Sequence, residues 1–195
     1  MTQMDDKSLD VIFRKARTYT AWQNKPVDDA LLVQVYELCK WGPTSSNCCP
    51  MRLMFVKSKQ AKERLKPCLA AGNVDKTMAA PATAIIAYDL AFYNEMPKLW
   101  PPSDMKSVFA KNPELARTTG FRNGSLQGAY FIIAARALGL DCGPMSGFDN
   151  AKVDEAFFKG TDIKSNFLCN LGYGDASKLY PRGPRLTFSE ACKIA

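Results

Sequence analysis

The chain of 195 residues contains no histidine. Ser–His and Cys–His nucleophilic machinery is therefore excluded, and so is zinc bound through imidazole. Proton transfer must come from another side chain, from water, or from the substrate and cofactor themselves.

Sequence signals for a membrane span, a secretory leader and a dinucleotide fold are also missing. No apolar run approaches the ~18 residues that a membrane helix requires. The first ten residues, "MTQMDDKSLD", are acidic and polar, unlike a secretory signal, so we expect a cytoplasmic protein. No G-x-G-x-x-G follows a predicted strand, which leaves a Rossmann site unsupported.

Basic residues exceed acidic ones by 26 to 19, giving a net charge of +7, but they are dispersed along the chain. Without a run of four or more, a nucleic-acid-binding protein is only a weak alternative, to be tested by salt-dependent binding of DNA. Binding a phosphorylated small molecule would use the same cations. We expect no nucleic-acid partner and no membrane.

The seven cysteines do not form a disulfide framework, because their number is odd and no pair has CxxC spacing. Cys39 and Cys169 lie in apolar patterns and are predicted to be core thiols. Cys48 and Cys49 are adjacent, in the loop "WGPTSSNCCP" that precedes an apolar run. Three roles for this loop stay open: a thiol redox site, a metal site, or a surface for a ligand; we expect no metal.

Hydrophobic periodicity predicts alternating helices and strands. Residues 28–42 form an amphipathic helix with Leu31, Leu32, Val35, Tyr36, Leu38 and Cys39 on one broad face. Residues 51–56, 82–89 and 164–174 are predicted buried strands, and residues 58–69 and 153–158 short helices. The pattern indicates an α+β fold, with a mixed sheet flanked by helices, in a single domain over residues 1–195.

Two segments do not fit a simple surface element. Residues 93–115, with four prolines, are predicted to be an irregular excursion that could act as a lid. Residues 122–138 are apolar nearly all round, which predicts a helix buried centrally or at a subunit interface.

Polar, glycine-rich clusters far apart in the sequence contain cations suited to a phosphate: Arg17, Lys76, Arg182 and Arg185. Alone, each cluster is ordinary turn chemistry. Together, the stretches "ARTYTAW", "KWGPTSSNCCPMRLMFV", "GNVDKTMAAPATAIIAYD", "FRNGSLQGAYFIIAARALGLDCGPMSGFD" and "NLGYGDASKLYPRGPRLTF" resemble the flavin-dependent nitroreductase superfamily over nearly the whole chain. They are most similar to the short bacterial subgroup that includes malonic semialdehyde reductase of the Rut pyrimidine-degradation pathway.

The resemblance implies an intertwined homodimer that binds FMN at the subunit interface. Its Arg-Ser/Thr pair, at the flavin phosphate and ribityl chain, matches Arg17 and Thr18. Its flavin-lining loop from the partner chain matches Pro43, Thr44, Ser45 and Asn47. The superfamily's residue pair at the flavin pyrimidine edge matches Asn73 and Lys76. Its turn that faces flavin N5 matches Pro144, Met145, Ser146 and Gly147. Its C-terminal phosphate contact matches Arg185, with Arg182. No catalytic side chain is assigned, because the flavin carries the chemistry.

One departure from the superfamily concerns the charge near the flavin. Many members have a Lys or Arg two residues after the Arg-Ser/Thr pair, and this chain has Thr20. A nearby cation favours reduced flavin, which is an anion at N1. Unless Lys76 compensates, the flavin potential should be lower than in members with the extra charge.

The resemblance implies an FMN-dependent oxidoreductase that uses NADH or NADPH and a small-molecule electron acceptor. In the subgroup the acceptor is a small aldehyde such as malonic semialdehyde, reduced to 3-hydroxypropanoate. The alternatives are a broad-specificity nitroaromatic or quinone reductase and a non-catalytic flavin-binding protein.

Overall fold

The protein is described by a computed structural model over residues 3–195, in which four strands form one sheet. The strand order is β1-β2-β4-β3, with all neighbours antiparallel. The strands are β1 (Met51–Val56), β2 (Ala82–Asp89), β3 (Asp141–Met145) and β4 (Ile163–Gly172). The predicted α+β class is confirmed. The sheet, however, is antiparallel rather than mixed: within residues 3–195, the parallel contact is an isolated bridge between Thr18 and Cys142.

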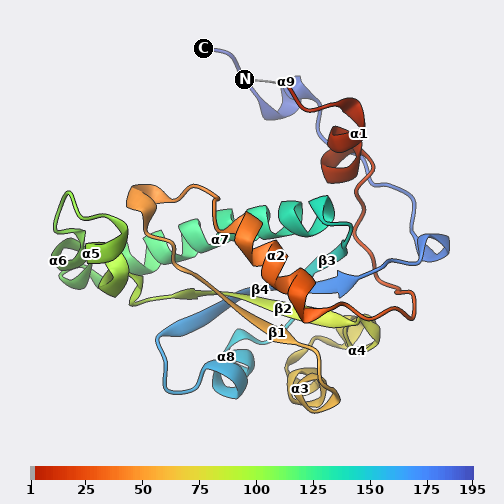
Figure 1. The fold of residues 1–195 in the computed structure, drawn as a ribbon, viewed down its shortest axis with the longest axis horizontal. Helices are drawn as coiled ribbons and strands as arrows, with labels where there is room; N and C mark the ends of the chain where they lie inside the picture. Colours follow the sequence, from red (N-terminus) through yellow and green to blue (C-terminus); the bar gives the residue numbers. More distant parts are fainter. Residues whose placement is uncertain (1–2) are drawn as a thin grey trace.

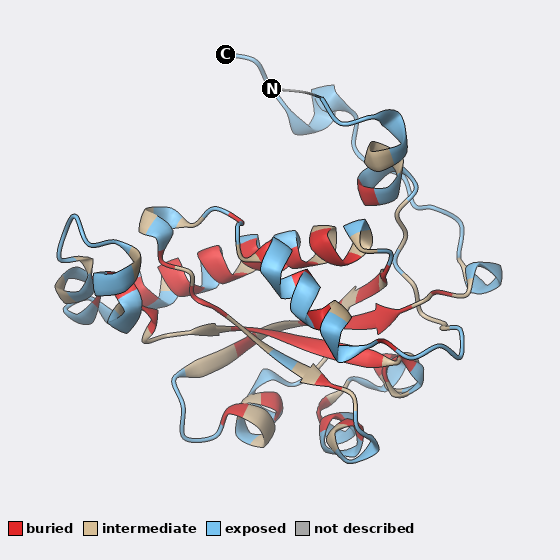
Figure 2. Ribbon diagram, viewed as in Figure 1, coloured by how far each residue is buried: buried red, intermediate tan, exposed pale blue. Residues whose placement is uncertain are grey.

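Helices cover both faces of the sheet (Figure 1). On one face lie α2 (Asp29–Cys39) and α7 (Pro113–Ala137), and on the other α3 (Lys59–Leu65), α4 (Val74–Ala79) and α8 (Asn150–Phe158). Along β2, Ala84 and Ile86 pack toward α2 and α7, while Ile85 and Ala87 pack toward α3 and α8. This two-residue alternation places a hydrophobic core on each side of the sheet (Figure 2).

Helix α7 differs from the predicted apolar helix over residues 122–138. It begins at Pro113, with the Asn112 side chain accepting a hydrogen bond from the Leu115 amide as an N-cap. Its buried face includes Gly124 and Gly128, where an added Cβ would lie 2.9 Å from Tyr88 and 2.7 Å from Phe167. Glycine therefore lets the helix approach the sheet closely.

The rest of the buried face of α7 is partly polar, and its outer face carries large apolar side chains beside charged ones such as Arg122. Asn123 and Gln127 are buried and hydrogen-bonded to the segment before and at the start of β1. Large apolar side chains remain exposed on the other side: Phe121 (49 %), Leu126 (48 %) and Tyr130 (40 %). The prediction of a helix apolar on all sides was thus wrong for the face that packs on the sheet.

The segment over residues 93–115 is helical for much of its length, not irregular as predicted. It contains most of the 3-10 helix η5 (Phe92–Glu95), α5 (Met96–Leu99), α6 (Met105–Ala110) and the start of α7. Phe92, Met96 and Phe109 form a small core of their own beneath these short helices. The prolines end or begin helices here rather than preventing them.

Other predicted elements are present with local corrections. Tyr36 and Leu38 of α2 are exposed, so its buried face is narrower than predicted. Strand β1 is an edge strand and only its two ends are buried. Strand β3 was not predicted, because "DCGPM" reads as a turn; Pro144 is tolerated because β3 is the opposite edge.

The two terminal segments lie outside the layers (Figure 1). The first contains α1 (Asp6–Leu9) and a π-helical turn, η1 (Asp10–Arg14), and the last contains α9 (Phe188–Ala191). Every residue from 180 onward is exposed (Figure 2). These segments have little contact with the sheet but converge where the sequence predicts phosphate-binding residues.

Candidate cofactor site

Arginines from three parts of the chain line one pocket of about 620 Å³, which we call the cationic pocket. Arg17 and Thr18 come from the N-terminal segment, and Arg182 and Arg185 from the C-terminal tail, so the structure brings these four predicted residues together. The other lining residues are Phe13, Arg14, Ala16, Thr20, Arg136, Tyr180, Pro181 and Gly183.

Hydrogen bonds between the two terminal segments hold the cationic pocket in shape. The Arg17 guanidinium donates to the Tyr180 carbonyl, and Arg182 Nη2 donates to the Ala16 carbonyl at 2.9 Å. The Tyr19 amide donates to the Cys142 carbonyl at 3.0 Å, which attaches the N-terminal segment to β3. The N-terminal segment therefore lies against β3, the edge strand that leads into the predicted turn at 144–147.

The charge of the cationic pocket is largely uncompensated. Arg14 is neutralised by Asp6 at 2.8 Å and Asp10 at 2.6 Å. Within residues 3–195, the other lining arginines, Arg17, Arg136, Arg182 and Arg185, make no ion pair with a carboxylate. Such a group of arginines is suited to an anion with several oxygen atoms.

Arg136 was missed by the sequence analysis. It lies near the end of α7, and its Nε is buried without a hydrogen-bond partner, while Nη1 donates to the Ile12 carbonyl at 3.3 Å. An unpartnered buried donor is costly, and an anion in the pocket would relieve that cost. The sequence signal for Arg136 is a cation within an otherwise apolar helical stretch.

The predicted turn at 144–147 and the predicted residue Asn73 are in direct contact. Asn73 Nδ2 donates to the Gly147 carbonyl at 2.7 Å, and the Ala70 amide donates to the same carbonyl at 3.0 Å. A Cβ on Gly147 would lie 2.5 Å from Asn73 Nδ2, so glycine is required for this approach. The backbone N–H groups of Ser146 and Gly147 have no hydrogen-bond partner within residues 3–195 and remain available to a ligand.

Lys76 links this turn region to the N-terminal segment. Its carbonyl accepts hydrogen bonds from Trp22 Nε1 at 3.1 Å and from Asn170 Nδ2 at 3.3 Å. Its ammonium makes no ion pair among the described residues, so it is a further free cation near the turn. Asn73, Lys76 and the 144–147 turn, including Pro144 and Met145, thus adjoin the segment that follows Arg17 and Thr18.

The loop with Pro43, Thr44, Ser45 and Asn47 lies elsewhere in the same chain. The Ser45 amide donates to Asn123 Oδ1 of α7 at 2.9 Å, whereas Arg136 of the cationic pocket is 13 residues further along that helix. A rise of 1.5 Å per residue separates these two positions by about 20 Å. The structure of one chain therefore does not join this predicted loop to the other predicted residues.

The backbone of this loop is strained. Ser46, Asn47 and Cys49 have positive φ values of 48°, 51° and 38°, which are unusual for residues other than glycine. Asn47 Nδ2 donates to the Leu99 carbonyl at 3.0 Å, and the Cys49 amide donates to Thr44 Oγ1 at 3.2 Å. The loop is thereby held against the helical segment over residues 93–115.

Cys48 is a structural side chain of this loop. It is fully buried against Phe92 and Met96, and burial raises the pKa of its thiol to about 11. It is therefore protonated at neutral pH, which does not suit a nucleophile or a metal ligand. Within residues 3–195, no group of three Cys, Asp or Glu side chains is arranged to hold a metal ion.

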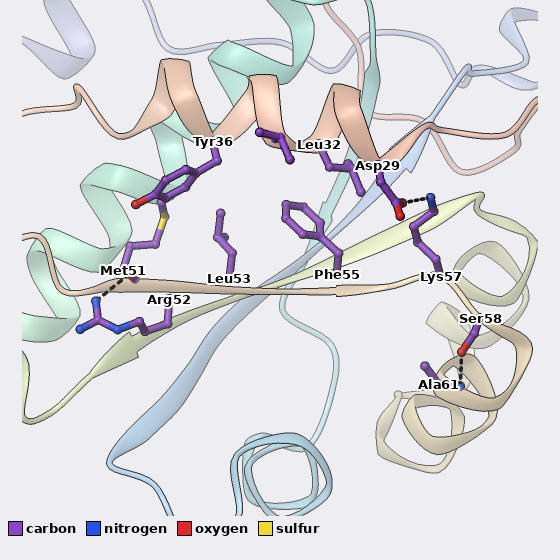
Figure 3. A pocket seen from close by; sticks show the side chains of 11 residues that line it. Asp29, Leu32, Tyr36, Met51, Arg52, Leu53, Phe55, Lys57, Ser58 and Ala61 are labelled. Carbon is purple, nitrogen blue, oxygen red and sulfur yellow. Dashed lines mark hydrogen bonds and ion pairs between the residues drawn. The ribbon is translucent and has the colours of Figure 1, made fainter.

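A larger pocket, of about 840 Å³, lies between α2 and the edge strand β1, away from these residues. Leu32 and Tyr36 of α2 point toward Leu53 and Phe55 of β1, and a Lys57–Asp29 ion pair closes one end (Figure 3). None of the predicted site residues lines it. Its apolar walls instead mark an uncovered edge of the sheet.

Comparisons with known proteins decide the family. The Nitroreductase family model matches residues 14–173. The chain belongs to the nitroreductase family. A protein of Burkholderia lata, provisionally named an NADH dehydrogenase/NAD(P)H nitroreductase, is 60 % identical over 194 residues and is covered completely by this chain. One from Stenotrophomonas maltophilia with the same provisional name is 59 % identical, with 98 % of each chain covered.

A nitroreductase-family fold is also found among solved structures. An Exiguobacterium sibiricum protein provisionally named a nitroreductase, crystallised in complex with FMN, aligns over the full length of both chains with a TM-score of 0.85 and 18 % identity. The nitroreductase-like fold is thus confirmed. No helix among residues 3–195 is long and apolar enough to cross a membrane. The malonic semialdehyde reductase subgroup is not distinguished by these comparisons.

Proposed function

We propose that this nitroreductase-family protein is an FMN-dependent oxidoreductase that uses NADH or NADPH. The observation that carries the proposal is the cationic pocket, with four arginines free of carboxylates and the orphaned Arg136 Nε. These residues fit the terminal phosphate of FMN, because several guanidinium groups can donate charge-assisted hydrogen bonds to the phosphate oxygen atoms. FMN, when bound, supplies the two-electron chemistry between nicotinamide and acceptor.

The side chains of this protein would bind and orient the flavin rather than react. Arg17, Thr18, Arg182 and Arg185, with Arg136, would hold the phosphate. Asn73 and Lys76 would face the polar edge of the ring, and the free amides of the 144–147 turn would donate to it. This division of roles explains how a chain without histidine can catalyse electron transfer.

A homodimer is the second part of the proposal. The loop over residues 43–47 is about 20 Å along α7 from its own cationic pocket, so a second chain would have to supply it to the same flavin. The exposed Phe121, Leu126 and Tyr130 of α7 offer an apolar surface for a two-fold interface. The exposed tail and the uncovered β1 edge support an intertwined arrangement.

Light scattering tests the dimer, with an expected mass near twice 21.6 kDa. Leu126→Glu should shift the protein toward monomer and release flavin, because a carboxylate would be buried in the interface. Ala151→Glu, at an exposed position of α8 on the other face of the sheet, is the matched control and should leave the dimer intact. A wild-type monomer that holds flavin tightly would contradict an interfacial site.

The electron acceptor we favour is a nitroaromatic or quinone. Trp100 is partly exposed next to Leu99, whose carbonyl accepts from Asn47, so an aromatic surface borders the proposed flavin-lining loop. A flat aromatic acceptor could stack there. The provisional names of the relatives at 60 % and 59 % identity agree with this class.

The small-aldehyde acceptor, malonic semialdehyde, rests on sequence resemblance alone. Steady-state kcat/KM values for malonic semialdehyde, a nitroaromatic and a quinone, measured with both nicotinamides, separate the acceptors. A value for the aldehyde well above the other two would reverse our preference.

The cofactor itself is tested by mass spectrometry of what the purified protein releases. We expect FMN at about one per chain. FAD, or no flavin after reconstitution, would remove the basis of the proposal. FMN that neither NADH nor NADPH can reduce would instead identify a non-catalytic flavin-binding protein.

A further inference from the structure

Lys62 of α3 is a buried lysine with no acidic partner. It is 5 % exposed, and within residues 3–195 it makes no ion pair. Its Nζ donates to the Thr77 carbonyl and to Thr83 Oγ1, both at 2.7 Å. Lysine is almost never fully buried without a compensating charge, so this one requires an explanation.

Hydrogen bonds extend from Lys62 across the sheet. Thr83 of β2 donates its hydroxyl to Asn170 Oδ1 of β4 at 2.7 Å, leaving the hydroxyl oxygen to accept from Lys62. Asn170 Nδ2 in turn donates to Thr77 Oγ1 at 3.2 Å. The ammonium and the Asn170 amide therefore hold Thr77 of α4 from two sides, through its carbonyl and its hydroxyl.

The far end of this network consists of the proposed flavin-binding residues. Asn170 Nδ2 also donates to the Lys76 carbonyl at 3.3 Å, and Thr77 Oγ1 donates to Met145 Sδ at 3.5 Å. Lys76 and Met145 were both assigned to the flavin site from the sequence. The buried lysine thus lies directly behind the part of α4 that carries Lys76 and contacts the end of β3.

The charge of Lys62 is not cancelled by its surroundings. Burial lowers the pKa of the ammonium to about 8, and no neighbouring charge contributes to that shift. The side chain is consequently still mostly protonated at neutral pH. Since a neutral amine could make both hydrogen bonds with its two N–H groups, positioning alone does not require the charge.

We propose that Lys62 is a positioning residue of the flavin site, which fixes the α4 backbone at Lys76 and Thr77 and supplies an uncompensated positive charge that favours the reduced, anionic flavin. This inference rests on the proposed FMN function. It also offers a source for the charge that Thr20 does not provide in the N-terminal segment. At an effective dielectric constant of about 20, a unit charge has to lie within about 12 Å of an anion to change such an equilibrium tenfold.

The experiment measures, anaerobically, the reduction potential of FMN bound to the holoprotein and the affinity of the flavin-free protein for oxidised FMN, in wild type and variants; together they give the affinities for oxidised and for reduced FMN. Lys62→Met should lower the preference for reduced FMN about tenfold, which corresponds to a potential about 30 mV lower for a two-electron couple. Lys62→Arg keeps the charge and should remain within about threefold of wild type. Lys59→Met is the matched control, because Lys59 is an exposed lysine on the same helix and solvent screens its charge. Its preference for reduced FMN should also remain within about threefold of wild type.

A second neutral variant covers the case in which Lys62→Met does not fold. Lys62→Gln retains a hydrogen-bond donor without the charge and should show the same loss of preference. The proposal would be overturned if both neutral variants kept the wild-type preference for reduced FMN, or if they bound oxidised and reduced FMN equally more weakly. A lysine with a purely structural role would give either of these results.

Failure of the proposed function is recognised separately. If the wild type binds no flavin, the proposed function falls and this inference falls with it. If the wild type binds FMN and the neutral variants keep its redox preference, the inference about Lys62 alone is wrong.

Discussion

Replacing Arg136 by methionine should affect flavin binding and stability in different ways. Methionine retains most of the apolar stem that packs at the end of α7 but removes the guanidinium. In the flavin-free protein, Arg136 Nε is buried without a partner and Nη1 makes one long hydrogen bond, 3.3 Å, to the Ile12 carbonyl. The same guanidinium lines the cationic pocket.

The two effects differ in size. A hydrogen bond to a charged group contributes about 1.5–3 kcal/mol, so Arg136→Met should weaken FMN binding by about 10- to 150-fold. Removing the unsatisfied buried Nε relieves a cost of about 1–3 kcal/mol, while losing the charge-assisted bond to the Ile12 carbonyl costs up to about 1.5–3 kcal/mol. These two contributions oppose each other, so the free energy of unfolding of the flavin-free variant should remain close to that of wild type.

Flavin fluorescence titration measures the affinity, and urea unfolding of the flavin-free protein measures stability. Arg185→Ala should weaken FMN binding by about 1.5–3 kcal/mol, and Arg182→Ala by less, because the resemblance to the superfamily assigns the phosphate contact to Arg185 first. Arg14→Ala is the control: Arg14 lines the same pocket but is paired with two carboxylates, so its loss should have little effect on affinity.

The reasoning would be refuted if Arg136→Met bound FMN as tightly as wild type, or if it lost affinity only in proportion to lost stability. Equal and unchanged affinities for the Arg185 and Arg182 variants would contradict the phosphate assignment. A large effect of Arg14→Ala would show that ion pairing does not decide which arginines are available.

The remaining predictions concern the turn, the cysteines and the buried lysine. Gly147→Ala should weaken FMN binding at least tenfold, because the added Cβ would lie 2.5 Å from Asn73 Nδ2. Gly72→Ala is the control: no atom lies within 4 Å of its added Cβ, so this variant should bind FMN as wild type does in the same titration. The double variant Cys48→Ser, Cys49→Ser should oxidise NAD(P)H at a rate within about tenfold of wild type, a change of ~1.4 kcal/mol in the activation barrier. If stopped flow shows that only the oxidative half-reaction is lost, the two cysteines are catalytic. Because the folded pKa of Lys62, about 8, is below the unfolded value of 10.5, the unfolded chain binds more protons between these pH values. The unfolding free energy of wild type should therefore rise relative to Lys62→Met by about 2–3 kcal/mol from pH 8 to pH 10.5, and a constant difference in urea titrations would contradict the burial of an uncompensated charge.

Elements with a clear apolar pattern could be predicted from the sequence. Strand β2 was recognised as a short continuous apolar run just after a proline, and helix α2 because its apolar residues recur with helical spacing. Tyr36 and Leu38 were assigned to the buried face of α2 because periodicity groups apolar residues on one side of a helix without telling which of them the fold covers, and both are exposed. Strand β3 was missed because pairing with β4, rather than its own composition, makes Pro144 part of a strand.

The site could be predicted only as far as local motifs reach. Arg17 and Arg185 are 168 positions apart, and only the folded chain places both in one pocket with Arg136. Lys62 carried no sequence signal at all, since a lysine in "SKQAKERLK" reads as a solvated helix face. Its importance depends on burial and on hydrogen bonds to β2 and α4, which are tertiary features.

Anaerobic titration of the purified protein with NADH and with NADPH tests the central claim most directly. The account predicts that about one equivalent of at least one nicotinamide bleaches the visible absorption of one bound FMN per chain, and that adding a quinone or a nitroaromatic restores it. Bound FMN that stays oxidised with both nicotinamides, or a protein that takes up no FMN, would contradict the account.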